Sequence, residues 1–432
     1  MFGHKGPWDS GPFSATQERT IPSFPLRVLR DCLKHFFQLQ TNIKIPEGLR
    51  TAHLYTDTAE MSGTAGQVYL VTGGCGFLGK HLVRMLAESG EGVSEIRAFD
   101  LRPDREIETL STDSVTVTMV QGDLTDREQL FRASEGVDVI IHVAGIVDVF
   151  GRLPEATLEK VNVEGTRYVI EACVRNGIQS CVFTSSMEVV GPNIKGQPFY
   201  RGNEETSYNT FHSNAYARSK AKAEELILKA NGMEVTGGKT LHTCVLRPVG
   251  IYGESCPLLR MFYERAGGRG GRLFRFAPGT VQIGRVYVGN VAWMHLLAAR
   301  SLQEKPGVLG GQAYYCYDDS PDKSHLDFTM ELLGPCGVRL VGQERPVLPF
   351  ALVYMLACLA ELIQYILRPF YTFNLFLNRS ILTLTTSTFT VQTDKAARHF
   401  GYRPLFSWDE ARGRTVRWLQ SLMPLAMKSG RH

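Results

Sequence analysis

Short apolar runs alternate with longer stretches of helical spacing from residue 67 onward. Runs such as Val137–His142 (VDVIIH) have the length and composition of buried strands. The stretches between them, for example Leu158–Val174 and Ala215–Ala230, repeat apolar residues three or four positions apart, which predicts helices. We expect strands at residues 67–72, 95–100, 115–120, 137–142, 179–185 and 241–247. This alternation predicts an α/β fold, a doubly wound parallel sheet with helices on both faces.

The first predicted strand ends in a glycine-rich turn, Val68–Gly79 (VYLVTGGCGFLG), and a helical pattern follows. Gly73 allows a tight turn, and Gly76 lets backbone N–H groups approach a pyrophosphate. Gly79 lets the helix pack closely on the strand, and the helix N-terminus offers unpaired N–H groups and a partial positive charge. The spacing therefore predicts a dinucleotide-binding turn of the Rossmann kind.

The second predicted strand ends in Asp100, 21 residues after Gly79. A carboxylate there can accept hydrogen bonds from the adenosine ribose and would repel the additional phosphate of NADP, so NAD is the expected cofactor. Arg102 keeps NADP open as an alternative, because a guanidinium could accept that phosphate. The ends of the third and fourth strands add further candidates. The expected cofactor-binding residues are Gly73, Gly76, Phe77, Leu78, Gly79, Asp100, Asp123, Leu124, Ala144, Gly145, Tyr216 and Lys220.

Tyr216 and Lys220 lie four residues apart on a predicted helix, so both side chains point the same way. A free tyrosine has a pKa of about 10, too high for a base at neutral pH. An ammonium group beside it, together with the positive nicotinamide ring, lowers this pKa and favours the phenolate, which could take the proton of an alcohol. Ser185 and Ser186 end the fifth strand, and a hydroxyl there could hold the same substrate oxygen. The combination predicts an alcohol dehydrogenase, whereas His142 is expected to be a packed strand residue.

Composition restricts the class of protein. The 432 residues are 44% hydrophobic and 21% charged, as expected for a folded protein with a sizeable core. A net charge of +4 without an aromatic and basic repeat gives no sign of a nucleic-acid partner. The nine cysteines form no CxxC pair, so neither a metal site nor a disulfide framework is expected. A reducing compartment that faces the cytosol fits this cysteine usage.

The chain divides into parts of different pattern. Residues 1–61, rich in Gly, Pro, Ser and Thr, are expected to be a flexible N-terminal extension. Residues 62–420 are expected to form the dehydrogenase domain, and residues 421–432 a tail. Within the domain, residues 62–248 would mainly bind NAD, and the less regular residues 249–420 would mainly form a smaller substrate lobe.

Longer motifs show a family resemblance that extends from Val68 to about Leu419. They are TGGCGFLG, IIHVAGIVDVFG, VNVEGT, TSSMEVVGPN, LRPVGIYGE, VYVGNVAWMH and TDKAARHFGYRPLFSW. In these the sequence resembles the extended short-chain dehydrogenase/reductase superfamily, and within it the 3β-hydroxysteroid dehydrogenase/Δ5–Δ4 isomerases. KGQPFYRGNE and MELLGPCGVRL are most similar to the branch that acts on 27-carbon sterols in bile-acid synthesis.

The resemblance implies oxidation of the 3β-hydroxyl of a Δ5 sterol, with 7α-hydroxylated cholesterol derivatives as expected substrates, and a shift of the double bond to Δ4. It makes Tyr216 the general base, Lys220 its partner and Ser186 the residue that orients the substrate. Asn162 would be a structural and proton-relay residue, with helix packing as the alternative. Tyr314 and Asp318 would serve the isomerisation, although Asp318 could instead be a turn residue at a strand end.

A long apolar segment suggests contact with a membrane. No side chain between Arg345 and Glu361 is charged, and the apolar character continues to Leu367. A helix over 347–367 would be about 31 Å long, close to the hydrocarbon thickness. A single crossing would separate the closing part of the domain from the rest. We therefore expect residues 346–376 to dip into one leaflet, with a buried core helix as the alternative.

Several alternatives stay open on the sequence alone. The steroid-hormone branch of the same family, a sugar-nucleotide epimerase or dehydratase, and a nucleotide-sensing protein without turnover share the scaffold. The expected partners are a sterol and membrane lipid, without nucleic acid or metal, and a homodimer is among the assemblies that the sequence allows. The expected location is the endoplasmic reticulum membrane, with the catalytic domain facing the cytosol.

Overall fold

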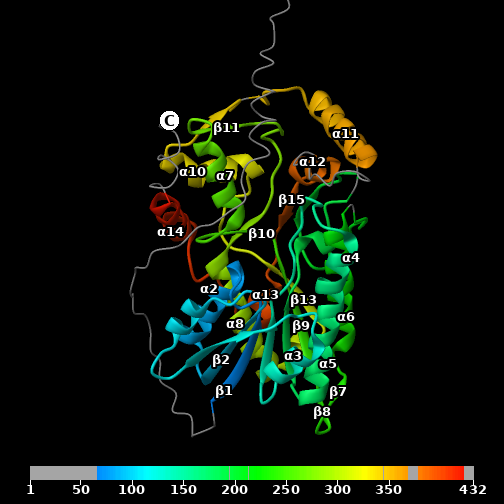
Figure 1. Cartoon of the computed structure of the whole chain (residues 1–432), viewed down its shortest axis with the longest axis vertical. Helices are drawn as coiled ribbons and strands as arrows, with labels where there is room; N and C mark the ends of the chain where they lie inside the picture. The colour runs from blue at the N-terminus through cyan, green and yellow to red at the C-terminus, as the bar shows by residue number, and fades with distance from the viewer. Residues whose placement is uncertain (1–65, 194, 213, 344, 368–377, 423–432) are drawn as a thin grey trace, which may run out of the picture. The chain divides into compact units, whose positions relative to one another are not determined.

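The computed structural model describes residues 66–193, 195–212, 214–343, 345–367 and 378–422, all of which belong to one compact unit. The predictions for residues 1–61 and for nearly all of the tail lie outside the described residues. The centre of the unit is a seven-stranded sheet in which every neighbouring pair of strands is parallel (Figure 1). From edge to edge, the strands are β13 (Gln312–Cys316), β9 (His242–Pro248), β5 (Ser180–Thr184), β4 (Val139–His142), β1 (Gln67–Thr72), β2 (Val93–Asp100) and β3 (Thr116–Gln121).

Both faces of the sheet are buried. Successive side chains along a strand point to opposite faces, so each strand contributes to two cores. Leu70, Ile140 and Phe183 pack in one core cluster, and their chain neighbours Val71 and Ile141 pack in another. The first face is covered by α3 (Arg127–Ala133), α5 (Gly165–Asn176) and α6 (Ala215–Ala230), and the second by α2 (Phe77–Ser89) and α8 (Val288–Glu304). The doubly wound fold is therefore confirmed, and the six predicted strands agree with the observed bounds to within two residues.

The seventh strand, β13, was not predicted. It belongs to the part assigned mainly to the substrate lobe, yet it pairs with β9 and completes the sheet. The helix α8 that precedes it packs on the sheet as well. A run as short as Tyr314–Cys316 cannot be told from a turn by periodicity, although all three side chains are buried. Residues 249–420 thus contribute to the core as well as to the lobe.

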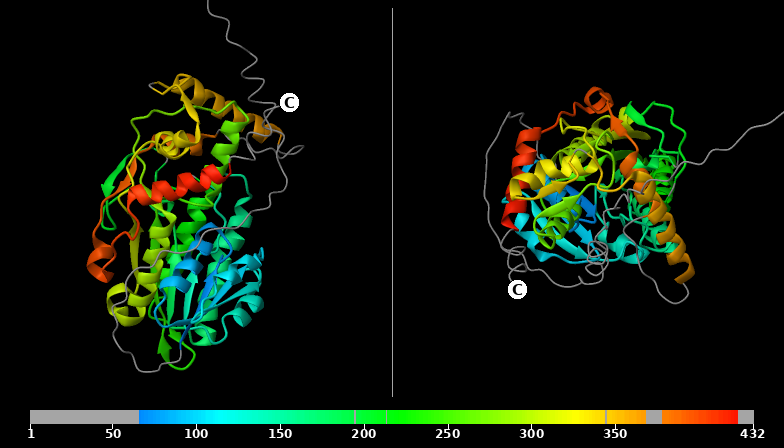
Figure 2. Two further views of the ribbon diagram at one scale, coloured as in Figure 1. Left: turned by 90° about the vertical axis from the view of Figure 1, so that its left-hand side faces the viewer. Right: turned by 90° about the horizontal axis from the view of Figure 1, so that it is seen from above.

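A second layer of small elements lies beyond the carboxyl ends of the strands (Figures 1 and 2). Its two-stranded parallel pairs are β10 (Gly250–Tyr252) with β12 (Arg285–Tyr287), β11 (Arg272–Phe274) with β14 (Arg339–Val341), and β6 (Phe199–Gly202) with β15 (Phe389–Val391). Its helices include α7 (Pro257–Gly267), α10 (His325–Leu333) and α14 (Trp408–Ser421). This layer faces the edge at which the candidate site lies.

The remaining elements are short. They are η2 (Arg105–Leu110), α4 (Glu155–Leu158), the π-helical turn η3 (Glu159–Glu164), η4 (Met187–Val189), β7 (Glu234–Val235), β8 (Lys239–Thr240), α9 (Pro306–Leu309), η5 (Gly334–Cys336), α12 (Arg379–Thr386) and α13 (Lys395–Phe400). The elements α4, η3 and α5 follow one another without a break and include the predicted helix Leu158–Val174.

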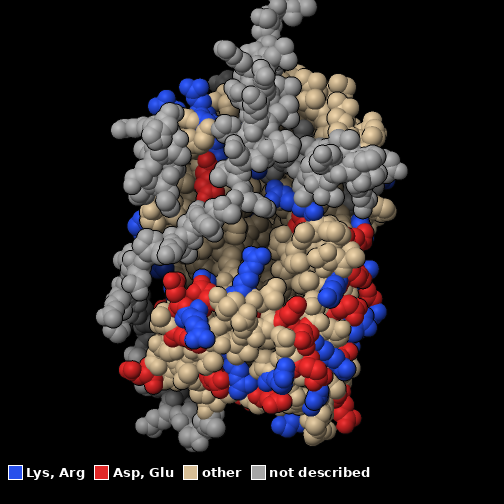
Figure 3. All heavy atoms as spheres, viewed as in Figure 1, with Lys and Arg blue, Asp and Glu red and all other residues tan. Residues whose placement is uncertain are grey.

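The apolar segment forms the helix α11 (Phe350–Leu367), whose described side chains are buried along one side only. Val353 and Ala357 pack against Leu382 of α12. The exposed stripe consists of Met355, Leu359, Leu362 and Ile366, each at least half exposed. On the face drawn in Figure 3, the atoms of α11 that are visible at the upper right belong to uncharged residues. The alternative of a buried core helix is therefore wrong. Within the described residues, no helix is long and apolar enough to cross a bilayer; residues 368–377 are not among them.

Candidate active site

The turn between β1 and α2 is closed too tightly for side chains. Gly73 has a φ of +71°, and a Cβ on it would lie 2.8 Å from the Cα of Ala144. A Cβ on Gly79 would lie 2.0 Å from the carbonyl oxygen of Gly73. The helix begins at Phe77 after Gly76, which makes no side-chain cap, and its first turn holds no acidic residue. Its N-terminal N–H groups are therefore available to a phosphate.

Asp100 is held beside this turn. Its carboxylate accepts hydrogen bonds from the backbone N–H of Cys75 (3.1 Å) and of Arg102 (3.0 Å). The other predicted cofactor-binding residues of the sheet follow neighbouring strands, Asp123 and Leu124 after β3 and Ala144 and Gly145 after β4. The chain leaves β1 and β4 on opposite sides, which is the switch point where doubly wound sheets bind nucleotides. The narrow turn, the uncapped helix and the carboxylate together fit NAD.

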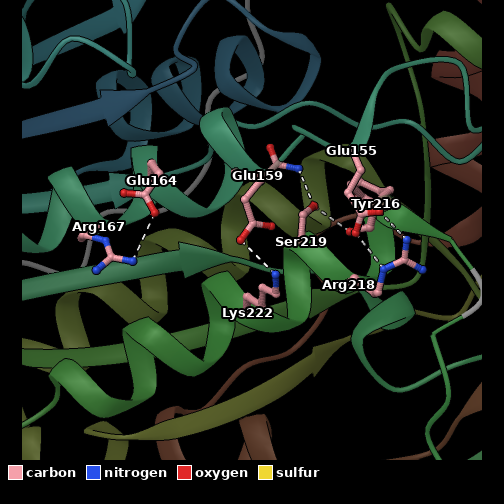
Figure 4. A network of polar contacts seen from close by, with 9 residues as sticks. Glu155, Glu159, Glu164, Arg167, Tyr216, Arg218, Ser219 and Lys222 are labelled. Atoms are coloured by element: carbon pink, nitrogen blue, oxygen red, sulfur yellow. Dashed lines mark hydrogen bonds and ion pairs between the residues drawn. The ribbon is translucent and has the colours of Figure 1, made fainter. Parts of the chain in front are cut away.

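The helix α6 carries the predicted base and is fixed at several points. Asn214 caps its N-terminus. Arg218 pairs with Glu155 (2.9 Å), and Lys222 pairs with Glu159 (2.9 Å), which ties the exposed side of α6 to α4 and η3 (Figure 4). These pairs are exposed, so we assign them positioning rather than much stability.

Tyr216 is buried in the first turn of α6, with 5% of its surface exposed. Ser186 lies close enough to lower the pKa of Tyr216, and the hydroxyl of Ser186 accepts from the N–H of Glu188 (3.2 Å). Ser185 points elsewhere and donates to Glu224 at 2.5 Å. The structure thus brings Ser186, and not Ser185, to Tyr216, as the resemblance implied.

Lys220 lies one turn further along α6. Its Nζ donates to the carbonyl oxygen of Thr184 (2.8 Å) and lies 4.1 Å from the ring centre of Phe183. Burial lowers the pKa of Lys220 to about 7, and the charge of Glu224 opposes that shift. Lys220 therefore holds the end of β5, immediately before the two serines.

The pKa of Tyr216 is raised, not lowered. Burial is the largest cause and the carboxylate of Glu188 the second, while Ser186 acts in the opposite direction. Lys220 by itself does not lower this pKa, because its ammonium group is directed to Thr184; the joint effect of Lys220 and the positive nicotinamide ring stays a prediction. Deprotonation of Tyr216 therefore requires additional positive charge at the site.

Glu188 is a site residue that the sequence did not reveal. It lies in η4, is 7% exposed and accepts a hydrogen bond from Nδ2 of Asn214 (3.1 Å). Burial raises its pKa to about 7, and the hydrogen bond from Asn214 opposes the shift. A carboxyl group with such a pKa can donate or accept a proton near neutral pH.

We expect the wild type to lose stability as the pH rises to neutral, and Glu188→Gln to avoid this loss. The pKa of Glu188 is higher in the folded chain than the ordinary 4.5, so the folded state is favoured while the group is protonated. In the wild type this advantage is complete below pH 4.5 and is lost as pH rises through 7. Between pH 4.5 and pH 8, the free energy of unfolding should therefore fall by up to about 3 kcal/mol more in the wild type than in the variant.

Chemical denaturation at pH 4.5 and pH 8 measures this difference. Glu234→Gln is the control, because Glu234 is exposed and should leave the pH dependence unchanged. Equal pH dependence in the wild type and Glu188→Gln would contradict the prediction.

Asn162 is fully engaged within the protein. Its Nδ2 donates to the carbonyl oxygen of Ile146 (3.0 Å) and to Ser219 of α6 (2.9 Å), and its Oδ1 accepts from the N–H of Ile146 (2.8 Å). A Cβ on Gly145 would lie 3.2 Å from this Oδ1. Asn162 thus joins the loop after β4 to α6, which supports its structural role; the proton-relay role stays a prediction.

Tyr314 and Asp318 make their hydrogen bonds with residues other than Tyr216. Tyr314 is buried, and its hydroxyl pairs with His399 of α13 (3.0 Å). The Oδ2 of Asp318 accepts from the N–H of Tyr287 (2.8 Å) and from Asn290 (2.9 Å), which suits the turn alternative. Their assignment to isomerisation receives no support from these contacts.

Two further groups received no functional weight from the sequence. His142 is buried between Thr72 and Thr166, and burial lowers its pKa to about 3, in keeping with a packed strand residue. Glu224 forms a buried ion pair with Arg247. Its position four residues after Lys220 was the signal that could have found it, since both lie on one helix face.

The glycine turn after β1 and the buried Tyr216, close to Ser186, lie at the same edge of the central sheet. That geometry fits a dinucleotide-dependent dehydrogenase, the class that the resemblance implied. The pattern of the 3-beta hydroxysteroid dehydrogenase/isomerase family matches residues 70–349, and the chain belongs to this family. The predicted family and the assignment as an oxidoreductase are confirmed.

Two curated relatives are similar over most of the chain. The 3 beta-hydroxysteroid dehydrogenase type 7 of Mus musculus is 55% identical over 355 residues, which cover 82% of this chain and 96% of the relative. The protein of the same name from Homo sapiens is 55% identical over 354 residues, with the same coverage. These matches favour the steroid interpretation over the sugar-nucleotide and sensor alternatives.

A solved structure supports the fold. The dTDP-glucose 4,6-dehydratase DesIV of Streptomyces venezuelae, with NAD bound, superimposes with a TM-score of 0.59 at 21% identity. The match covers 83% of this chain and 98% of that one. At this identity the likeness establishes the fold alone.

Proposed function

We propose that this protein oxidises the 3β-hydroxyl group of a Δ5 sterol with NAD and then moves the double bond to Δ4. The expected substrates are 7α-hydroxylated cholesterol derivatives of bile-acid synthesis. The observation that carries the proposal is the buried Tyr216 close to Ser186, at the sheet edge that holds the dinucleotide turn. The proposal of a sterol as the substrate is supported by membership of the family.

Each residue of this group has a distinct task. Ser186 binds the oxygen of the 3β-hydroxyl group, and Tyr216 takes its proton. Lys220 keeps the end of β5 in place through the carbonyl oxygen of Thr184. NAD, when bound, accepts the hydride and adds the positive charge that the raised pKa of Tyr216 requires.

The test is NADH formation by the detergent-solubilised full chain with NAD or NADP. The sterols are 7α-hydroxycholesterol, pregnenolone and dehydroepiandrosterone. Turnover of 7α-hydroxycholesterol alone supports a bile-acid substrate, and turnover of the shorter steroids supports the hormone branch. No turnover of any sterol, with NAD still bound, would overturn the proposal.

Glu188 is better suited to the isomerisation than Tyr314 and Asp318. Moving the double bond requires a group that accepts one proton and donates another, and Glu188 combines a pKa of about 7 with a position close enough to affect Tyr216. We therefore expect Glu188→Gln to form NADH while the Δ5-3-ketone accumulates, with isomerisation slowed about 10²-fold or more.

Product analysis by chromatography measures the ratio of Δ5- to Δ4-3-ketone. Asp318→Asn is the comparison variant and should leave this ratio near that of the wild type. An unchanged ratio in Glu188→Gln would contradict the role of Glu188.

The exposed stripe of α11 suits a membrane surface. It presents apolar side chains on the side opposite α12, and a sterol substrate partitions into lipid. We therefore keep the prediction that residues 346–376 dip into one leaflet, at the endoplasmic reticulum with the catalytic domain facing the cytosol. The homodimer likewise stays a prediction.

We expect Met355→Glu combined with Leu359→Glu to weaken binding to phospholipid vesicles at least about tenfold, because two charges would enter the apolar boundary. Sedimentation with vesicles measures the bound fraction. The control is Val308→Glu with Leu405→Glu, which places the same charges on exposed sites away from α11. Equal binding of both double variants would exclude α11 as the contact.

A further inference from the structure

Arg285, the first residue of β12, holds a buried charge without a counter-charge. Its side chain is 8% exposed, and its pKa, lowered by burial to about 10, leaves it protonated at neutral pH. Among the described residues, the one ionisable group whose charge acts on it is the thiol of Cys256. Burial raises the pKa of that thiol, so it is neutral. A buried guanidinium without an anion is costly unless something else neutralises it.

His325 extends the same cluster. Its Nδ1 pairs with Nη2 of Arg285, and a guanidinium can only donate, so Nδ1 accepts and the proton lies on Nε2. Burial and the charge of Arg285 keep the pKa of His325 well below its ordinary value, so the ring is neutral. The Nε2 of His325 and the Nε of Arg285 are both buried and have no partner. Two adjacent side chains thus present two unused donors and one net positive charge.

Within the part of the chain that the structure describes, the surroundings add no competing acid. His325 begins α10, whose N-terminus carries a partial positive charge. Asp327, in the first turn of that helix, is engaged with Arg275 and Ser324. The guanidinium carbon of Arg285 lies 5.2 Å from the ring centre of Phe328. A Cβ on Gly250 would lie 2.5 Å from Nη1 of Arg285. Gly250 lies two residues after the end of β9, so the cluster lies in the layer that faces the candidate active site.

We propose that Arg285 and His325 form a buried binding site for a carboxylate group. A carboxylate supplies two acceptor oxygens for the two unused donors and the negative charge that the guanidinium lacks. The group can come from a small free carboxylate or from the end of a sterol side chain. The second source rests on the proposed function.

Thermal unfolding of the full chain in detergent, with acetate against chloride at constant ionic strength, tests the site. Acetate should raise the wild-type melting temperature by about 2–5 °C, and the rise should level off as the acetate concentration increases. Arg285→Met should abolish this rise and, without acetate, should unfold at the wild-type temperature or above, because it removes an uncompensated charge. His325→Phe should reduce the rise, and Arg272→Met, at an exposed arginine of β11, should retain it.

An equal acetate response in Arg285→Met, or no response in the wild type, would overturn the site. A lower melting temperature of Arg285→Met without acetate would overturn it as well, because the guanidinium would then be compensated within the chain.

Sterol turnover separates the two sources. The probes are a 3β-hydroxy-Δ5 sterol whose side chain ends in a carboxylate and the same sterol ending in an alcohol. If the substrate supplies the carboxylate, Arg285→Met lowers kcat/KM for the acid at least about tenfold and for the alcohol less than about twofold. If kcat/KM is unchanged for both, the acetate response assigns the site to a free carboxylate. Equal loss on both sterols would overturn the assignment. Failure of the proposed function, no NADH from either sterol, leaves the acetate result unaffected.

Discussion

Tyr216→Phe should lower kcat about 10²- to 10⁴-fold and leave the dissociation constant for NAD within about threefold of the wild type. The variant keeps the ring that fills the buried position in α6 and loses only the hydroxyl group close to Ser186. Binding of the dinucleotide depends on the turn after β1, which this change does not touch. Steady-state NADH formation and NAD titration by intrinsic fluorescence measure the two effects separately.

Tyr200→Phe is the matched control, because that tyrosine is 58% exposed and should keep wild-type kcat. Retention of more than about a tenth of kcat in Tyr216→Phe would show that another group takes the proton.

Gly79→Ala should abolish NAD binding, with a dissociation constant raised at least about 100-fold. The new Cβ would lie 2.0 Å from the carbonyl oxygen of Gly73, a backbone atom that cannot move aside as a flexible side chain could. Either α2 moves off the sheet or the turn opens, and both remove the N–H groups that would bind the pyrophosphate. Isothermal titration with NAD measures the loss, and circular dichroism shows whether the fold survives.

Two other alanines calibrate this result. Gly76→Ala meets the same carbonyl at 3.1 Å and should weaken NAD binding less. Gly307→Ala, in α9, meets nothing within 4 Å and should leave binding unchanged while stabilising the fold by about 0.5–1 kcal/mol. Wild-type affinity in Gly79→Ala would mean that this turn does not hold the dinucleotide.

The central sheet was predictable because its strands are buried on both faces. Continuous apolar runs mark such strands, and a glycine turn marks where the first one ends. β13 escaped because it is short and because its role is defined by pairing with β9, which no local pattern reports. The small parallel pairs beyond the sheet, such as β10 with β12, also depend on distant partners.

Within the site, sequence spacing placed Tyr216 and Lys220 on one helix face but could not give the direction of the ammonium group. Its hydrogen bond to the carbonyl oxygen of Thr184 depends on how α6 packs, so Lys220 by itself does not lower the pKa of Tyr216. Glu188 was missed for a related reason. A glutamate after a strand reads as a solvated residue, and only the fold shows that it is buried with Asn214 as its partner.

The late position of β13 in the chain has a consequence for synthesis on the ribosome. Until residues 312–316 have emerged, β9 is the outer strand of the sheet, and one side of its backbone has no hydrogen-bond partners. The helix α8, which covers the adjacent face, is also made late. A nascent chain of this length therefore exposes an unpaired strand edge and an apolar face together, a combination that promotes aggregation. A sheet that is closed by a strand from the last third of the sequence therefore stays prone to aggregation until that strand has been made.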